Sequence, residues 1–244
     1  MTSQAVRLRL VTDPNDPAIA AFGILQERAY FEPDALIPAA FIGRMLDMST
    51  AERRNFLLVA EQGGEVVGGS VFHFFAAPNT GFSSFLAVAP EVRGQGIARR
   101  LHEKRFETLD GAAGKPVLGV FIDVVNPARL TPQELEAERA VGSDPFARRR
   151  IFGKLGFRQV GARYQQPLGG PGGGPITNMD LLFCPRQFAH QAVAESVPLG
   201  AVLDTMRAYW LPWLGEQRTE RALNQLEEQA NGRGELPLLP TLPE

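Results

Sequence analysis

The stretch VRGQGIARRL, residues 92–101, places two glycines directly before a run with the periodicity of a helix. From Ile97 to Leu109 most apolar positions fall within one broad arc at about 100° per residue. Gly94 and Gly96 have two interpretations. Either they permit a tight turn and close helix packing, or they expose successive backbone N–H groups at a helix start, where the helix dipole also favours a phosphate.

Two common phosphate-binding templates do not fit this stretch. A dinucleotide fingerprint requires G-x-G-x-x-G early in the chain with an acidic residue about 20 positions later, and a P-loop requires G-x-x-x-x-G-K-[ST]. The spacing of the glycines matches neither pattern. If this loop binds a phosphate, the ligand therefore belongs to another class.

Strands are expected on both sides of the glycine loop. GFSSFLAVA, residues 81–89, precedes it and follows the turn cluster APNTG. PVLGVFIDVV, residues 116–125, follows it and is apolar almost throughout, which is typical of a strand covered on both faces. Strand, loop, helix and strand together predict a βαβ unit.

The remaining chain predicts further strands and helices. Strands are expected over 6–10, 55–62, 65–75, 158–167 and 175–184, and helices over 19–30, 39–48, 131–140, 144–156, 199–210 and 217–230. Residues 126–144 are interpreted as a helical insertion. The glycine-rich LGGPGGGP, residues 168–175, is expected to form a loop, and the end of the chain from Gly232 is expected to fray.

Two ordered motifs resemble those of the GNAT (GCN5-related) N-acetyltransferase superfamily. Arg93, Gly96 and Ala98 occupy the defining positions of the motif R/Q-x-x-G-x-G/A, and KLGF at 154–157 resembles a second signature. The resemblance covers about residues 5–184. It implies an α/β (α+β) fold with a central mixed, mostly antiparallel sheet of about seven strands flanked by helices. A GNAT domain is then expected over 1–190, followed by a C-terminal helical extension and frayed tail over 191–244.

The resemblance also implies a co-substrate, acetyl-CoA or another acyl-CoA. Backbone groups of one segment would bind the pantetheine arm, and those of the glycine loop would surround the diphosphate. The first group comprises Leu86, Ala87 and Val88, and the second comprises Arg93, Gly94, Gln95, Gly96, Ile97, Ala98 and Arg99. This agrees with the residues themselves, because glycine lacks the Cβ atom that would keep backbone amides away from phosphate oxygens.

By the same resemblance, the reaction is direct acyl transfer to an amine. The backbone N–H of Val88 is the candidate oxyanion donor. The chain departs from the family at Phe152, where many members carry a tyrosine that protonates the departing thiolate. Either another group serves, or the thiolate leaves unassisted, or the protein is an inactive module that binds acyl-CoA without turning it over.

Three residues are candidate catalytic groups, each with a structural alternative. Asp123 lies within an apolar strand, where a buried carboxyl has a raised pKa; this suits a base and equally a structural anchor. His73 in SVFHFF is either the base or a core histidine. Tyr164 in RYQQP either replaces the missing tyrosine or belongs to the core.

Composition and charge limit the remaining assignments. The 25 basic and 27 acidic residues give a net charge of −2, which argues against a nucleic-acid partner. One cysteine and three dispersed histidines predict no metal site. The N-terminus lacks the apolar core of a signal peptide and no apolar stretch is long enough to span a membrane, so a cytoplasmic location is expected.

The sequence names neither the acceptor nor the quaternary structure. We expect a small-molecule or peptide amine as substrate. The loop at 168–175 is either a mobile flap over the acceptor site or a turn without a role. The tail carries Trp210 and Trp213 on a helical stretch, and it either docks on the domain, covers the acceptor site or forms a homodimer.

Overall fold

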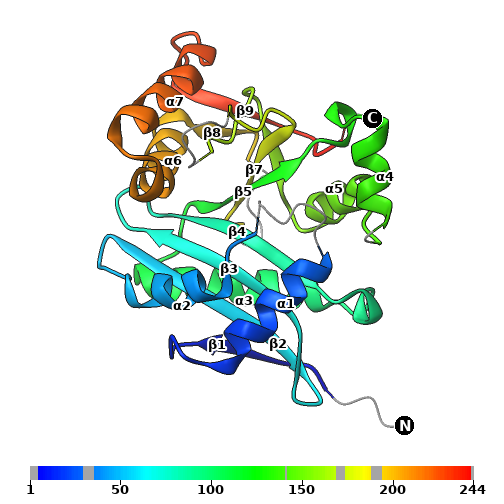
Figure 1. Ribbon diagram of the computed structural model, residues 1–244. Helices are drawn as coiled ribbons and strands as arrows, with labels where there is room; N and C mark the ends of the chain where they lie inside the picture. Colours follow the sequence, from blue (N-terminus) through cyan, green and yellow to red (C-terminus); the bar gives the residue numbers. More distant parts are fainter. Residues whose placement is uncertain (1–4, 30–35, 141, 169–173, 188–193, 243–244) are drawn as a thin grey trace. The chain divides into compact units, whose positions relative to one another are not determined.

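The computed structural model describes residues 5–29, 36–140, 142–168, 174–187 and 194–242. Nine strands form one sheet in the order β1-β2-β3-β4-β5-β7-β6-β9-β8 (Figure 1). The β4–β5 pair is parallel, with Gly81 opposite Val120, whereas β5–β7, β6–β7 and β6–β9 are antiparallel. The predicted mixed, mostly antiparallel sheet flanked by helices is therefore confirmed.

The chain divides into two compact units. The first contains residues up to Phe74, Ser83–Lys115 and Pro132–Asp144, and the second contains Phe75–Phe82, Pro116–Thr131 and Pro145 onwards. Strands β3 and β4 pass from one unit into the other. The expected boundary at residue 190 divides the chain by sequence position and does not coincide with these two units. It stays a prediction.

The first unit contains four strands and four helices. Its elements are β1 (Arg7–Val11), α1 (Pro17–Ala29), α2 (Ala39–Asp47), β2 (Arg53–Gln62), most of β3 (Glu65–Phe75), most of β4 (Thr80–Val88), α3 (Ile97–Ala113) and α4 (Pro132–Ala140). Adjacent glycines of β3 show how the sheet is covered. A Cβ on Gly69 would meet the Phe22 ring of α1 at 2.7 Å, and a Cβ on Gly68 would meet Ile97 of α3 at 3.2 Å. Because neighbouring residues of a strand face opposite sides, α1 and α3 cover opposite faces.

The second unit contains the other strands and helices. Its elements are β5 (Gly119–Val125), α5 (Pro145–Lys154), β6 (Arg158–Val160), β7 (Met179–Pro185), β8 (Ser196–Pro198), α6 (Leu199–Leu214), α7 (Glu216–Gln229) and β9 (Glu235–Leu239). Leu181 and Phe183 of β7 pack in one core with Trp210 and Met206 of α6. The alternate β7 residue Asp180 instead contacts Arg149 of α5, so α6 and α5 cover opposite faces.

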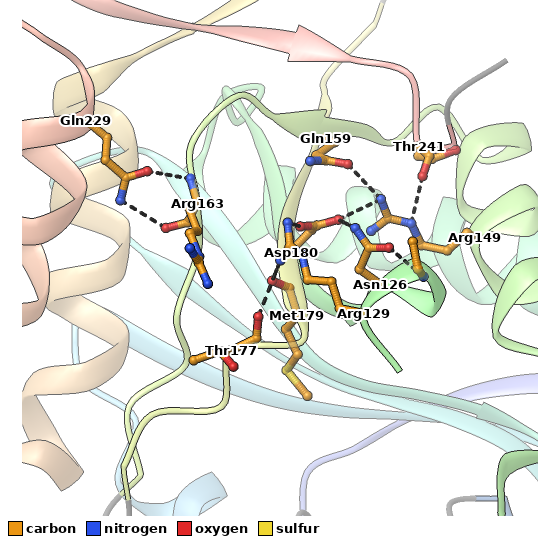
Figure 2. Close-up of polar contacts among 11 residues, drawn as sticks. Asn126, Arg129, Arg149, Gln159, Arg163, Thr177, Met179, Asp180, Gln229 and Thr241 are labelled. Carbon is orange, nitrogen blue, oxygen red and sulfur yellow. Dashed lines mark hydrogen bonds and ion pairs between the residues drawn. The ribbon is translucent and has the colours of Figure 1, made fainter. Parts of the chain in front are cut away.

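The C-terminal helices pack on the second unit's own sheet. Tyr209 stacks on Phe82 with ring centroids 3.9 Å apart. Thr205 of α6 and Thr80 of β4 share a hydrogen bond of 2.7 Å. The side-chain amide of Gln229 in α7 pairs with both backbone groups of Arg163 (Figure 2). Docking of the tail, one of the three expected alternatives, is therefore present in the fold.

A buried ion network joins α5 to β7 (Figure 2). Asp180 is fully buried, and its carboxylate accepts from Arg149 at 2.9 Å and from Asn126 at 2.8 Å, while Arg129 lies 2.8 Å from its other oxygen. The Nε of Arg149 donates to the Thr241 carbonyl at 2.7 Å. Burial lowers the pKa of Arg149, and Asp180 opposes this shift. The network thereby anchors the C-terminal end of the chain.

Two expectations about the C-terminal half are wrong. The end of the chain does not fray after Gly232, because Glu235–Leu239 forms β9, which pairs with β6 and β8 and buries Leu236 and Leu238. The short strands β8 and β9 raise the strand number from about seven to nine. The helix expected over 199–210 is longer than predicted, because α6 continues through Pro212 to Leu214; it ends at Gly215, whose φ is +79°.

The strand expected over 158–167 is also shorter than predicted. Only Arg158–Val160 is a strand, and Gln166 then makes an isolated bridge with Ile176. The chain turns at Gly161, whose N–H donates to the Pro237 carbonyl of β9, and a Cβ at this glycine would lie 2.6 Å from the Pro237 ring. Contact with β9 thus redirects the segment. Of the predicted loop at 168–175, residues 169–173 lie outside the described residues.

Candidate functional site

The glycine loop connects β4 to α3 in the first unit. A 3-10 turn, Pro90–Val92, is followed by Gly94 with φ +83° and Gly96 with φ +77°. Residues other than glycine rarely adopt this left-handed backbone conformation. A Cβ added to either residue would have no described atom within 4 Å. Backbone conformation, not packing, therefore requires these glycines, and the space in front of them is open.

The start of α3 has the features of an anion site. Gly96 is the N-cap residue and supplies no side chain to the first amides, and the first turn contains no acidic residue. An α-helix leaves its first four N–H groups without intrahelical acceptors, and the dipole of a helix this long adds a positive potential there. The loop and helix start together can bind a phosphate group.

The side chain of Arg93 holds the loop in place. Its Nε donates to the Val88 carbonyl at 3.2 Å, and its Nη1 donates to the Gly142 carbonyl at 2.7 Å. Arg93 thus joins the end of β4 to the segment after α4. The guanidinium thus binds the protein's own backbone, and the expected role of Arg93 at the diphosphate stays a prediction. Arg99 is exposed beside the first turn of α3, and Arg100 donates to the Val6 carbonyl at 2.9 Å.

The end of β4 presents backbone groups beside this loop. The N–H of Ala89 donates to the Val67 carbonyl of β3 at 2.9 Å. In an extended strand, successive residues direct their backbone groups to opposite sides. The N–H of Val88 therefore faces away from β3. Leu86 and Val88 are half-buried and Ala87 is buried, so the predicted pantetheine segment combines apolar cover with an outward-facing amide.

His73 is held in the core of the first unit. Its Nδ1 lies 2.8 Å from Asn55 Oδ1 and its Nε2 lies 2.9 Å from Ser84 Oγ. Asn55 donates its Nδ2 to the Met45 carbonyl, which directs its oxygen toward the histidine. The neutral ring therefore carries its hydrogen on Nδ1 and accepts from Ser84 at Nε2.

The same surroundings weaken His73 as a base. Burial, followed by the charge of Arg53, lowers the pKa of His73 well below its ordinary value. Both ring nitrogens are engaged by Asn55 and Ser84. This geometry favours the structural alternative stated for His73, and its role as base stays a prediction.

Asp123 and Tyr164 lie together in the second unit. The Oη of Tyr164 is 3.1 Å from Asp123 Oδ2 and also contacts Gln166 Oε1. Asp123 is the one residue of β5 that keeps partial exposure, whereas Tyr164 is fully buried. Burial raises the pKa of Asp123 to about 6. Burial also raises the pKa of Tyr164 well above 10.

A carboxyl whose pKa is near neutrality can both take up and release a proton at physiological pH. Asp123 therefore has the ionisation expected of a proton-transfer group. Tyr164 is poorly suited to act alone, because its hydroxyl is buried and strongly resists ionisation. It contacts Asp123 directly, and its catalytic role stays a prediction.

Phe152 lies in the core of the second unit. It is 8% exposed, and its ring makes an edge-to-face contact with Phe157 at a centroid distance of 5.4 Å. An apolar side chain in this packing supplies no proton. The departure from the family pattern at this position is therefore a true loss of a hydroxyl group.

The structure groups the predicted residues by unit. The ten predicted cofactor residues lie along one continuous β4–loop–α3 segment of the first unit. The second unit brings Asp123 and Tyr164 together. Sequence reasoning missed Ser84, Asn55 and Gln166. Gln166 had one usable signal, since it follows Tyr164 by two positions and an extended segment places such residues on the same side.

Two further expectations concern metals and membranes. The described residues contain no group of three or more His, Cys, Asp or Glu arranged to hold a metal ion. None of the helices in the described part of the chain is long and apolar enough to cross a bilayer.

The fold is that of an α/β protein with an open glycine loop at the start of α3. Residues 19–129 match the model of the acetyltransferase (GNAT) family, a segment that runs from α1 through the loop and beyond β5. Residues 19–129 are thus similar to this family, as the motif at Arg93, Gly96 and Ala98 predicted. No curated protein matches the chain in sequence.

Two solved structures show the same fold at low sequence identity, and a third is similar to the chain with a lower TM-score. A GNAT family protein from Bacteroides thetaiotaomicron is 13% identical, with 86% of this chain and 99% of that chain covered and a TM-score of 0.51. Ard1 from Thermoplasma volcanium is 16% identical, with coverage of 75% and 99% and a TM-score of 0.50. A GNAT family acetyltransferase from Elizabethkingia anophelis, solved with acetyl-CoA bound, is 17% identical, with coverage of 74% and 98% and a TM-score of 0.46.

Proposed function

We propose that this protein is an acyl-CoA-dependent N-acyltransferase that moves an acetyl group from acetyl-CoA to an amine of a small molecule or peptide. The observation that carries the proposal is the loop at Gly94 and Gly96. Both glycines have positive φ, and the space that a Cβ would fill is empty of described atoms. A diphosphate that enters such a loop meets backbone N–H groups at a helix start.

The residues of the first unit fit such a ligand. Amides from Gly94 to Arg99 would hold the diphosphate, with the exposed Arg99 adding positive charge. Backbone groups of Leu86, Ala87 and Val88 would hold the pantetheine arm. Arg93 fixes the loop through its bonds to Val88 and Gly142, so the amides are arranged before the ligand arrives.

When bound, acetyl-CoA supplies an activated thioester acyl group. The outward-facing N–H of Val88 is suited to stabilise negative charge on a carbonyl oxygen. Asp123 is suited to take a proton from an amine, because its pKa of about 6 leaves it mostly ionised at pH 7 to 8 yet basic enough to accept a proton. Tyr164 would act by holding this carboxyl at 3.1 Å.

One observation favours a second candidate function. The buried Phe152 offers no hydroxyl at the position where many family members place their general acid. A protein that holds acyl-CoA without turning it over would have no use for that acid. The alternative is a non-enzymatic acyl-CoA-binding module.

Release of free thiol separates the two functions. The purified protein is incubated with acetyl-CoA and a panel of small-molecule and peptide amines, and thiol is followed against a protein-free blank. Turnover above the blank with any acceptor removes the binding-module alternative. Saturable CoA binding without turnover supports that alternative. A protein that neither binds CoA nor turns it over contradicts both.

Other expectations remain predictions attached to this proposal. They are the acceptor class, the absence of a nucleic-acid, membrane or metal partner, the homodimer and the cytoplasmic location. The homodimer has the most direct test, which is the molar mass in solution measured by light scattering.

A further inference from the structure

The hydroxyl of Tyr164 faces two oxygen atoms but has one hydrogen. Asp123 Oδ2 lies 3.1 Å from it, and Gln166 Oε1 also lies within hydrogen-bonding distance. An amide oxygen carries no hydrogen, so the contact with Gln166 must use the hydrogen of Tyr164. Tyr164 and Asp123 can then form a hydrogen bond only when the Asp123 carboxyl is protonated, because the carboxyl must be the donor and the phenol oxygen the acceptor.

Trp210 decides which end of the Gln166 amide faces Tyr164. The indole Nε1–H of Trp210 lies 3.4 Å from Gln166 Oε1 and can only donate. A reversed amide would set its NH₂ group against this donor. The backbone of Gln166 is held as well, by hydrogen bonds of 3.0 and 2.9 Å with Ile176. The amide oxygen is therefore directed at both Tyr164 and Trp210.

We propose that Trp210 and Gln166 are positioning residues that make Asp123 the hydrogen donor to Tyr164, so that α6 sets the protonation of the candidate catalytic carboxyl. The hydrogen-bond chain runs from Trp210 through Gln166 and Tyr164 to Asp123. Its catalytic meaning rests on the proposed function, whereas its direction is a property of the free protein. It gives the C-terminal extension a role beyond packing.

The surroundings of the chain are almost free of other charges. Among the described residues of this unit, the titratable groups that act on the Asp123–Tyr164 pair are the two residues themselves and Tyr209 of α6. Strand β7 presents apolar Leu181 and Phe183 to the same core, and α6 presents Trp210. Hydrogen-bond direction is therefore the strongest local influence on Asp123 after burial.

Titration of the Asp123 carboxyl in the ligand-free protein tests the proposal. The side-chain carboxyl carbon is followed by ¹³C NMR from pH 4 to 9, and its signal is assigned by its loss in Asp123→Asn. In Gln166→Met the phenol hydrogen is released to the carboxylate, so the midpoint should fall by about 1 pH unit, the size expected of one hydrogen bond to a charged group. Trp210→Phe should lower it too, because the amide can then reverse.

Gln165→Met is the matched control, because it removes the neighbouring glutamine and should leave the midpoint unchanged. If Gln166→Met leaves the midpoint where it is in the wild type, Tyr164 already donates to Asp123 and the proposal is wrong. The titration needs no turnover, so it can succeed even if no amine is acetylated. If the protein is an enzyme, the acidic limb of its kcat/KM profile should move with the carboxyl midpoint.

Discussion

The guanidinium of Arg93 donates a hydrogen bond of 2.7 Å to the carbonyl oxygen of Gly142 and a second, of 3.2 Å, to that of Val88. Val88 ends β4, and Gly142 follows α4, 49 residues further along the chain than Arg93. The arginine of the family motif is thus the residue that fixes the position of the glycine loop. A substitution at Arg93 should therefore alter the conformation of the loop, in addition to removing a positive charge near the ligand.

Substitution Arg93→Gln should lower the melting temperature of the ligand-free protein by about 2–4 °C, the shift expected for a loss near 1 kcal/mol in a chain of this length. It should also weaken CoA binding, because the amides are no longer held in place. Arg99→Gln is the control: Arg99 is exposed at the helix start, so its loss should weaken binding through charge alone. A fall in melting temperature for Arg99→Gln equal to that of Arg93→Gln would contradict the distinction.

Two glycines at opposite ends of α3 should respond in opposite directions. Gly96 has φ +77°, so Gly96→Ala should destabilise the protein by about 1–2 kcal/mol and place a methyl group where the diphosphate is expected. Gly111 lies inside α3, and a Cβ there meets no described atom. Gly111→Ala should therefore stabilise the protein by about 0.5–1 kcal/mol and leave CoA binding unchanged. Urea unfolding and a CoA titration check both variants.

Asp123 should make stability depend on pH. Burial raises its pKa from 3.8 to about 6 in the folded protein, so folding favours the protonated carboxyl. The wild type consequently loses stability from this group as pH rises from about 4 through 6, and the loss is complete above that range. Asp123→Asn removes this dependence. The melting temperature of the variant minus that of the wild type should rise between pH 4.5 and pH 8, and a flat or falling difference would show that the carboxyl is not buried in this way.

Removing one partner of the buried pair Arg149–Asp180 should lower the free energy of unfolding more than replacing both partners with apolar residues. Arg149→Met leaves Asp180 buried without its 2.9 Å partner and should destabilise the protein by about 3–5 kcal/mol. Adding Asp180→Leu should recover part of that loss, because two neighbours in one network are not additive. Lys154→Met, at an exposed position on the same helix, should have little effect. Chemical denaturation of the wild type, Arg149→Met, Asp180→Leu and the double variant measures the coupling, and strict additivity would contradict it.

The central part of the fold could be predicted because its signals are local. Gly96 and Ala98 have the spacing of the family motif, which predicts the loop before α3. The apolar run of β5 predicts a strand covered on both faces. The end of the chain could not be predicted in this way. Leu236 and Leu238 alternate as in a strand, but Pro237 lies between them, and their burial depends on pairing with β6, more than 70 residues earlier.

The candidate site was predictable to a similar extent. Asp123 and Tyr164 were found as individual residues, one as a carboxylate within an apolar strand and the other as a candidate replacement for the tyrosine missing at Phe152. Their contact, and the part that Gln166 and Trp210 play in it, depends on how α6 packs on the sheet. No sequence pattern encodes that packing, because Trp210 is typical of any buried helix face.

The proposed function depends on the backbone amides from Gly94 to Arg99 binding the diphosphate of coenzyme A. Two-dimensional ¹H–¹⁵N NMR of the labelled protein, titrated with coenzyme A up to millimolar concentration, observes these amides individually. We expect saturable shifts that are largest for Gly94, Gly96 and the first turn of α3, and that disappear in Gly96→Ala. Amide signals of this loop that remain unchanged at saturating coenzyme A, or shifts confined to another part of the chain, would contradict it.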